Sequence, residues 1–338
     1  MSKLTRIALI TGVVLRTCFC ADLPPLTQIA TMPIEGLKGG FDHFAVDLSR
    51  HRLYLAAEDQ KTVEVFDLMA RKHLSSISFF SRPHGLIFLR DSSILVVADG
   101  GEGNCKFVDV RSDTPKLLST VKTALRADSV TFDKAAHTMF VTNGGMVAKM
   151  DYSLVTAIDT AKEAASGEVK IQSKILEAMA FEKSSSRLFV NLMDKNSVTV
   201  IDRKTMQILN DWPLTAGLPS SLALDEEEQR LFVACRKPGR LLVLDTKSGK
   251  EVASLPCTGH ADDAFYNAAT KRIYVSGGED GVSVYQQDDP DHYRLLDNIK
   301  TGPEAKTSLL VPELKQLFVA VPPSGSMPAT VLIFSTNY

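Results

Sequence analysis

The chain has 338 residues, with 38 basic and 40 acidic side chains and a formal net charge of −2. This balance excludes a general attraction to nucleic acid and leaves room only for a local basic patch. Apolar residues make up 44% of the sequence, which is enough for a large core and excludes a disordered chain.

The first twenty residues differ from the rest and are predicted to be a secretory signal peptide. Lys3 and Arg6 form a basic start, and Ile7 to Leu15 is an apolar run far shorter than the roughly 20 residues that span a bilayer. Small residues follow near Ala21. A frayed N-terminus and a retained anchor are the alternatives. No other segment resembles a membrane span, so we expect a periplasmic or extracellular protein.

Removal of residues 1–20 would take away three basic and no acidic side chains. The remainder would hold 35 basic and 40 acidic side chains, a net charge of −5. Three cysteines would remain, Cys105, Cys235 and Cys257. Their odd number does not indicate a disulfide framework. A single bridge between Cys235 and Cys257 is one alternative if the protein is exported, and free buried thiols are the other, which we favour.

After this leader the chain repeats a pair of short strands around a polar turn, as in RLYLAAEDQKTVEVFD at 52–67. Copies begin at residues 52, 93, 138, 187, 230, 272 and 316, which are 41 to 49 residues apart. One apolar segment precedes each pair and another follows it. A repeat of about 40–45 residues with four strands is one blade of a β-propeller. The sequence therefore predicts an all-β, seven-bladed β-propeller with four antiparallel strands per blade, as a single domain over residues 25–336.

The two ends of the repeat predict how the ring closes. Residues 26–32 resemble the outer strand that follows each pair, whereas the last copy ends at 329–335 without an outer strand of its own. We expect the N-terminal strand to complete the last blade, because pairing would remove two exposed sheet edges.

The segments FVTNGG (140–145) and NSVTVIDRKTMQI (196–208) resemble the YVTN-repeat family of seven-bladed propellers, the YncE-like proteins. The resemblance covers nearly all of the chain after residue 25, although no Asn follows the strand in the first, second and seventh copies. It implies a propeller fold and an exported bacterial protein. The family motif contains no catalytic residue, so none is inferred from it.

Inner strands of a propeller line its central channel, and their starts share one face with the turns inside the strand pairs. Aligning the copies places two residues at the head of each inner strand. In chain order these are Asp42-His43, Pro83-His84, Asp128-Ser129, Glu177-Ala178, Ser220-Ser221, Asp262-Asp263 and Lys306-Thr307, with His260 just before the sixth pair.

The candidate ligand-binding residues at this funnel are Asp42, His43, His84, Asp128, Glu177, His260, Asp262, Asp263 and Lys306. Histidines with carboxylates can bind a divalent cation or carry out acid–base chemistry. The alternative is a polar channel wall without a ligand, because a channel filled by water needs polar walls. Residues of blades six, seven, one and two dominate the set.

No G-x-S-x-G, H-E-x-x-H or P-loop motif is present. The sequence therefore favours an exported binding or scaffold protein, a monomer, that recognises a protein or small-molecule ligand at the funnel. The alternative is a metal-assisted hydrolase or lyase, similar to propeller lactonases, that uses the histidines and acidic residues of the channel mouth. No cofactor is expected beyond a possible divalent cation.

Overall fold

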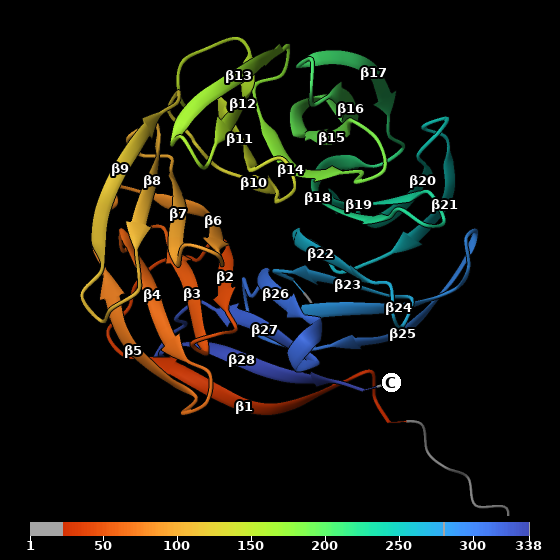
Figure 1. Ribbon diagram of the computed structural model, residues 1–338. Helices are drawn as coiled ribbons and strands as arrows, with labels where there is room; N and C mark the ends of the chain where they lie inside the picture. The colour runs from red at the N-terminus through yellow and green to blue at the C-terminus, as the bar shows by residue number, and fades with distance from the viewer. Residues whose placement is uncertain (1–22, 280, 338) are drawn as a thin grey trace, which may run out of the picture.

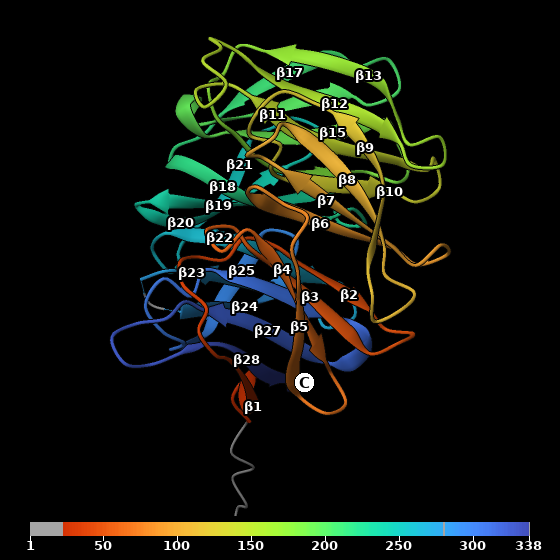
Figure 2. The same cartoon turned by 90° about the vertical axis from the view of Figure 1, so that its left-hand side faces the viewer.

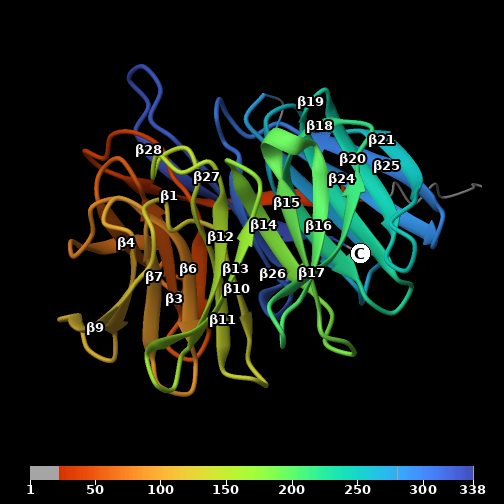
Figure 3. The ribbon, with the colours of Figure 1, turned by 90° about the horizontal axis from the view of Figure 1, so that it is seen from above.

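A computed structural model describes residues 23–337 except residue 280. Within these residues, 28 strands form seven sheets of four strands each. Figure 1 shows the sheets arranged around a central axis, and Figure 2 and Figure 3 show the same ring side-on. The predicted seven-bladed propeller is confirmed. The predicted signal peptide lies outside the described residues.

Each blade contributes four strands, called A to D from the channel outward. Blades one and two comprise β2 (Phe44–Asp47), β3 (Arg52–Ala57), β4 (Thr62–Asp67), β5 (Lys72–Ile77), β6 (Pro83–Leu89), β7 (Ile94–Asp99), β8 (Asn104–Asp109) and β9 (Lys116–Lys122). Blades three and four comprise β10 (Val130–Asp133), β11 (Thr138–Gly144), β12 (Ser153–Asp159), β13 (Ala164–Ile171), β14 (Leu176–Phe181), β15 (Arg187–Leu192), β16 (Ser197–Asp202) and β17 (Gln207–Pro213).

Blades five and six comprise β18 (Gly217–Asp225), β19 (Arg230–Lys237), β20 (Gly239–Asp245), β21 (Glu251–Pro256), β22 (Ala261–Asn267), β23 (Arg272–Gly277), β24 (Gly281–Asp289) and β25 (His292–Ile299). Blade seven comprises β26 (Thr307–Val311), β27 (Gln316–Val321), β28 (Ala329–Thr336) and the N-terminal β1 (Leu26–Ile34). Two 3₁₀ turns, η1 (Met193–Lys195) and η2 (Pro312–Leu314), complete the described elements.

The burial of the strands follows from their place in the blade. In β15 every residue after Arg187 is buried, because the B and C strands are covered on both faces by neighbouring blades. The outer strand β17 exposes nearly all of its residues except Trp212, which packs on Phe189. The core is therefore distributed between adjacent blades, where apolar side chains of two sheets meet.

The ring closes through the N-terminal strand, as predicted. Strand β1 pairs with β28 in antiparallel register, from Leu26 opposite Thr336 to Ile34 opposite Ala329. Figure 1 shows β1 and β28 side by side in this sheet. Met32 and Ile34 are buried against residues of blades one and seven, so β1 also supplies part of the core at the closure.

The three cysteines that the structure describes, Cys105, Cys235 and Cys257, are free thiols. Cys235 lies on β19 opposite Arg240 of β20, and Arg240 lies opposite Pro256 of β21. Strand β20 therefore separates Cys235 from Cys257. Because neighbouring strands lie about 4.8 Å apart, the two backbones are too distant for the ~4.4–6.8 Å that a disulfide spans. Burial raises the pKa of both thiols to about 12, which makes them unreactive.

None of the described residues belongs to a helix that is long and apolar enough to cross a membrane.

Candidate functional site

The A strands place one equivalent residue of each blade at the mouth of the channel. In blade one, Asp47 of the A strand lies opposite Arg52, the first residue of the B strand, and Asp42 lies five residues earlier. The same position in the successive blades holds Asp42, His84, Asp128, Glu177, Ser220, Asp262 and Lys306. Six of these seven side chains are ionisable.

The structure corrects the predicted alignment in blade two by one residue. Strand β7 begins at Ile94, which lies opposite Leu89, and Ser93 belongs to the turn with a φ of 52°. His84, and not Pro83, is therefore the equivalent of Asp42. In the segment SILVV, either Ser93 or Ile94 could be the first residue of the strand. The sequence pattern alone therefore could not distinguish the alignment on Ser93 from the alignment on Ile94.

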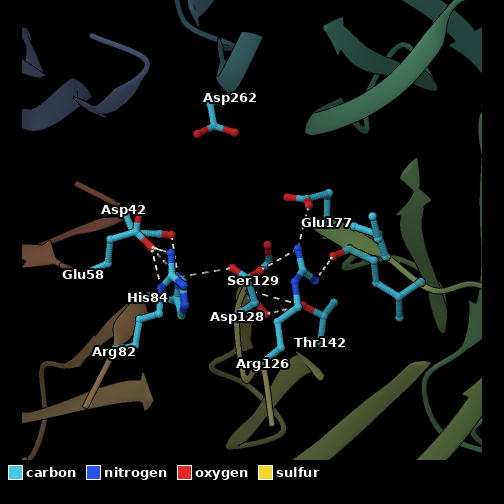
Figure 4. A network of polar contacts seen from close by, with 12 residues as sticks. Asp42, Glu58, Arg82, His84, Arg126, Asp128, Ser129, Thr142, Glu177 and Asp262 are labelled. Atoms are coloured by element: carbon cyan, nitrogen blue, oxygen red, sulfur yellow. Dashed lines mark hydrogen bonds and ion pairs between the residues drawn. The ribbon is translucent and has the colours of Figure 1, made fainter. Parts of the chain in front are cut away.

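One arc of the channel mouth is a chain of ion pairs from blade one to blade four. His84 Nδ1 lies 2.7 Å from Asp42 Oδ2 and 3.9 Å from Asp128 Oδ1. Arg126 Nη2 lies 3.0 Å from Asp128 and 2.8 Å from Glu177. Figure 4 shows these residues following one another, with Asp262 facing them from the other side. The arc joins four blades through side-chain contacts alone.

The opposite arc joins blades five, six and seven. Asp262 accepts a hydrogen bond from Arg236 at one oxygen and lies 3.0 Å from Lys306 Nζ at the other. The neighbouring Asp263 accepts the backbone N–H of Ser308 at 2.7 Å. Together, the two arcs bring ionisable side chains from all seven blades to one mouth.

Asp42 holds both histidines of the first two blades. His43 Nδ1 contacts Asp42 Oδ1, while His84 contacts the other oxygen. Burial opposes ionisation of Asp42, but the two imidazolium groups outweigh it and hold the pKa of Asp42 well below its usual value. Burial also disfavours the charged histidines, yet Asp42 raises the pKa of His43 to about 10 and that of His84 to about 9. All three groups are therefore charged at neutral pH.

Two carboxyls in the network are poorly compensated. Burial, followed by repulsion from Asp128, raises the pKa of Glu177 to about 7. Burial likewise raises the pKa of Asp263 to about 7, against the attraction of His43. Both groups therefore change charge near neutral pH.

Of the predicted funnel residues, the structure places all but one in this network. His260 lies apart on the surface, where its ring is 3.4 Å from Glu279 and its side chain is 53% exposed. Its role as a funnel residue is not supported by this position. Whether the others bind a ligand stays a prediction.

Sequence reasoning missed Arg126, Arg236, Glu58 and Arg82. Glu58 and Arg236 both lie six residues after the first arginine of their B strand, Arg52 or Arg230, so the alignment applied to the A strands would have found them. Arg126 precedes the A strand and carries a positive φ of 60°. No repeat signal marks that position.

Asp42, Glu58 and His84 form the described group whose ligand atoms lie close enough to hold a metal ion, within 4.8 Å of one another. Arg82 donates two hydrogen bonds to Glu58, at 2.9 and 2.7 Å, and both oxygens of Asp42 already contact histidines. A divalent cation would have to displace these cationic partners. The residues present therefore fit an ion-pair network better than a metal centre.

Comparisons with known proteins support the fold. No protein-family model matches the chain, and no curated protein matches its sequence. The chain is similar to a solved structure titled "Crystal Structure of Mitotic Checkpoint Complex", with a TM-score of 0.75 and 14% identity over 97% of this chain and 100% of the other. It is also similar to "Structure of U3-55K", with a TM-score of 0.72 and 13% identity over 88% and 97% of the two chains.

A third similar structure, "Crystal structure of RRP9 WD40 repeats", has a TM-score of 0.74 and 12% identity over 92% of this chain and 100% of the other. At such identities the likeness concerns the propeller fold alone.

Proposed function

We propose that this protein is a binding propeller that recognises a polar ligand, either a small molecule or a segment of a protein partner, at the mouth of its central channel. The observation that carries this proposal is the two arcs of ion pairs at the channel mouth, to which every blade contributes an ionisable side chain. Burying charges costs stability unless each is paired, and apolar residues can fill such sites at lower cost. A network of this extent with perturbed pKa values is typical of a functional site.

The chemistry of the mouth favours a ligand with a positively charged group. Arg126 is shared between Asp128 and Glu177, Arg236 and Lys306 both contact Asp262, and Asp263 has no cationic side chain in direct contact among the described residues. A cationic group bound at the mouth near Glu177 or Asp263 would hold that carboxyl ionised. Binding at pH 7 should therefore release protons.

This proposal is tested with a thermal-shift panel of amines, amino acids and short peptides, followed by calorimetry of the hits in buffers of different ionisation enthalpy. The wild type should bind cationic members with proton release. Glu177→Gln with Asp263→Asn should bind them more weakly, and the matched surface variant Glu313→Gln with Asp297→Asn should bind like the wild type. Equal binding by all three proteins would leave the network as a structural closure of the ring.

The second candidate is a metal-assisted hydrolase or lyase, favoured by the proximity of Asp42, Glu58 and His84. It is tested by calorimetric titration with Ca²⁺, Mg²⁺, Mn²⁺ and Zn²⁺. A metal enzyme would bind one of these ions stoichiometrically, and Glu58→Gln would abolish that binding. Absence of binding by the wild type would reject this candidate.

We also propose that the protein is an exported monomer related to the YVTN-repeat propellers. The leader-like residues 1–20 and the repeat segments at 140–145 and 196–208 support this proposal. Mass spectrometry of material expressed with its native start should show loss of the first twenty or twenty-one residues. An intact Met1 on the mature protein would reject export by this route.

A further inference from the structure

The opposite end of the ring, where the A–B and C–D turns lie, has seams between neighbouring blades. Several seams are closed by an arginine that begins a B strand and donates to a carbonyl of the next blade. These contacts are Arg187 to Thr246, Arg230 to Pro290 and Arg272 to Asn337. In blade four Arg187 also forms an ion pair with Glu182, the residue directly after the inner strand β14.

The seam between blades two and three is one of those in which no such contact is found among the described residues. Ile94 occupies the position of the arginine, and Leu89 occupies that of the acid. Neither side chain can reach across the seam with a hydrogen bond. A cavity of about 640 Å³ lies there, lined among others by Phe88, Ile94, Phe132 and Thr160.

A second cavity, of about 870 Å³, continues this opening toward blade four. It shares Phe132, Lys134 and His137 with the first and adds Phe181 and Lys183. The two cavities together, here called the seam groove, extend over the turns of three blades. Their phenylalanines form an apolar floor, which suits an extended chain better than a single compact molecule.

The rim of the seam groove is basic although the whole chain is slightly acidic. Five basic residues line the two cavities, Arg90, Lys134, Lys183, Arg203 and Lys204, against three acidic residues, Asp91, Asp133 and Glu163.

Two of these basic residues are engaged within the protein. Arg203 lies 3.1 Å from Asp133 and stacks over Phe181. Lys134 lies 3.3 Å from Asp91, but both side chains are exposed and the pair is weak. Lys183 and Lys204 form no direct ion pair with any residue that the structure describes.

We propose that the seam groove binds an acidic peptide segment of a protein partner, with one aromatic or large aliphatic side chain in the cavity over Ile94 and Phe132. The flanking carboxylates of the peptide contact Lys134, Lys183 and Lys204. A buried apolar anchor next to charge-complementary contacts is a common mode of peptide recognition. A nucleic acid is disfavoured because the chain as a whole has a net charge of −2, which gives a long polyanion no general attraction.

The test uses the whole protein and fluorescence anisotropy with labelled decapeptides that carry a central Phe, Leu or Ser flanked by Glu, Lys or Ser. The wild type should bind the Glu-flanked Phe and Leu peptides. Lys183→Glu with Lys204→Glu should bind them roughly tenfold more weakly. Lys116→Glu with Lys250→Glu, which makes the same charge change elsewhere on the surface, should bind like the wild type.

A second variant tests the anchor cavity. Ile94→Arg places an arginine where Arg187, Arg230 and Arg272 stand in blades four to six. The long side chain should fill the cavity and abolish peptide binding. The thermal unfolding midpoint should stay at or above that of the wild type. If Ile94→Arg fails to fold, the lysine variants decide the question alone.

Three results would overturn the proposal. One is that the wild type binds none of the acidic peptides. Another is that the groove variants and the surface control bind them equally. The third is that Lys-flanked peptides or a single-stranded oligonucleotide compete equally well.

Discussion

Asp42 links the histidines of two blades, and its ionisation determines theirs. The raised pKa values of His43 and His84, about 10 and about 9, mean that the folded protein holds these protons more tightly than the unfolded chain. Their contribution to stability is therefore fully present below the unfolded pKa of ~6.5 and is lost as pH rises through 9 and 10. The pKa of Asp42 is lowered, so the stability that this carboxylate contributes is present above its unfolded pKa of 3.8 and is lost as pH falls through the lower folded value.

Asp42→Asn should lower the free energy of unfolding by about 2–4 kcal/mol at pH 7, because two partly buried imidazolium groups lose their counter-ion. Urea denaturation measures the loss, which should shrink above pH 10, where the wild type has lost the same protons. The histidine pKa values, measured by NMR, should return toward ~6.5. As a control, Asp289→Asn breaks the exposed contact with His292 and should change stability within the error of the measurement. A similar loss in both variants would contradict the special role of Asp42.

Asp263 has a raised pKa, whereas that of Asp42 is lowered, so its pH dependence is opposite to that of Asp42 and runs in the same direction as that of the two histidines. Its folded pKa of about 7 lies above the ordinary value of 3.8, so the folded state binds more protons between these values and stability falls as pH rises. Asp263→Asn removes this cost and should raise stability by roughly 1–2 kcal/mol at pH 8.5 and by less at pH 5. Thermal unfolding at the two pH values measures the difference. A variant that is less stable than the wild type at pH 8.5 would show that the carboxylate is fully compensated.

At the scale of elements, β1 has two different faces. Met32 and Ile34 are almost fully buried in the closure between blades one and seven, whereas Ile29 lies at the register shift of the strand and is 37% exposed. The strand therefore contributes core side chains at both of its ends, Leu26 at the first and Met32 and Ile34 at the second, and covers the sheet edge with exposed side chains in between.

Met32→Ala should lower the free energy of unfolding by about 2–4 kcal/mol, because it leaves a cavity in a closed core. Ile29→Ala on the same strand should cost less than about 1 kcal/mol, since the side chain already contacts solvent. Chemical denaturation of both variants gives the comparison. Equal costs would mean that β1 does not pack as the structure describes.

At the scale of the whole molecule, the ring is held by apolar interfaces between adjacent blades and by the ion-pair network at one mouth. Removal of β1 would leave β28 with an unpaired edge. It would also leave a cavity in the core between blades one and seven, at the place that Met32 and Ile34 now fill. An unpaired edge is a template for pairing with another chain.

A protein that begins at residue 35 should therefore unfold at a lower temperature than one that begins at Leu23, and it should form oligomers that the longer protein does not form. Differential scanning calorimetry and analytical ultracentrifugation measure these effects. A monomer of unchanged stability would show that the ring does not need its N-terminal strand.

The repeat period, the apolar B and C strands, the spare outer strand at the N-terminus and the missing outer strand of the last copy were enough to predict seven blades and their closure. These features are local, since each blade repeats the same alternation of short strand and turn. The network of the mouth was predicted only in part. The heads of the A strands share one offset in the sequence, and this offset identified Asp42, Asp128, Glu177, Asp262 and Lys306.

Only the tertiary structure revealed Arg126 and Arg236 as partners of these carboxyls and His260 as a surface residue. Arg126 and His260 lie in connections before the inner strands that repeat poorly, whereas Arg236 lies on β19 at an offset that only the aligned B strands reveal. The ion pairs of these arginines join blades that are separate in the chain. The cavity at the seam between blades two and three was likewise revealed only by the tertiary structure. Ile94 and Leu89 are ordinary strand residues in the sequence, and their meaning appears only against the arginine and acid that occupy the same positions in blade four. A one-residue uncertainty in register was enough to hide that comparison, because side chains alternate between the two faces of a strand.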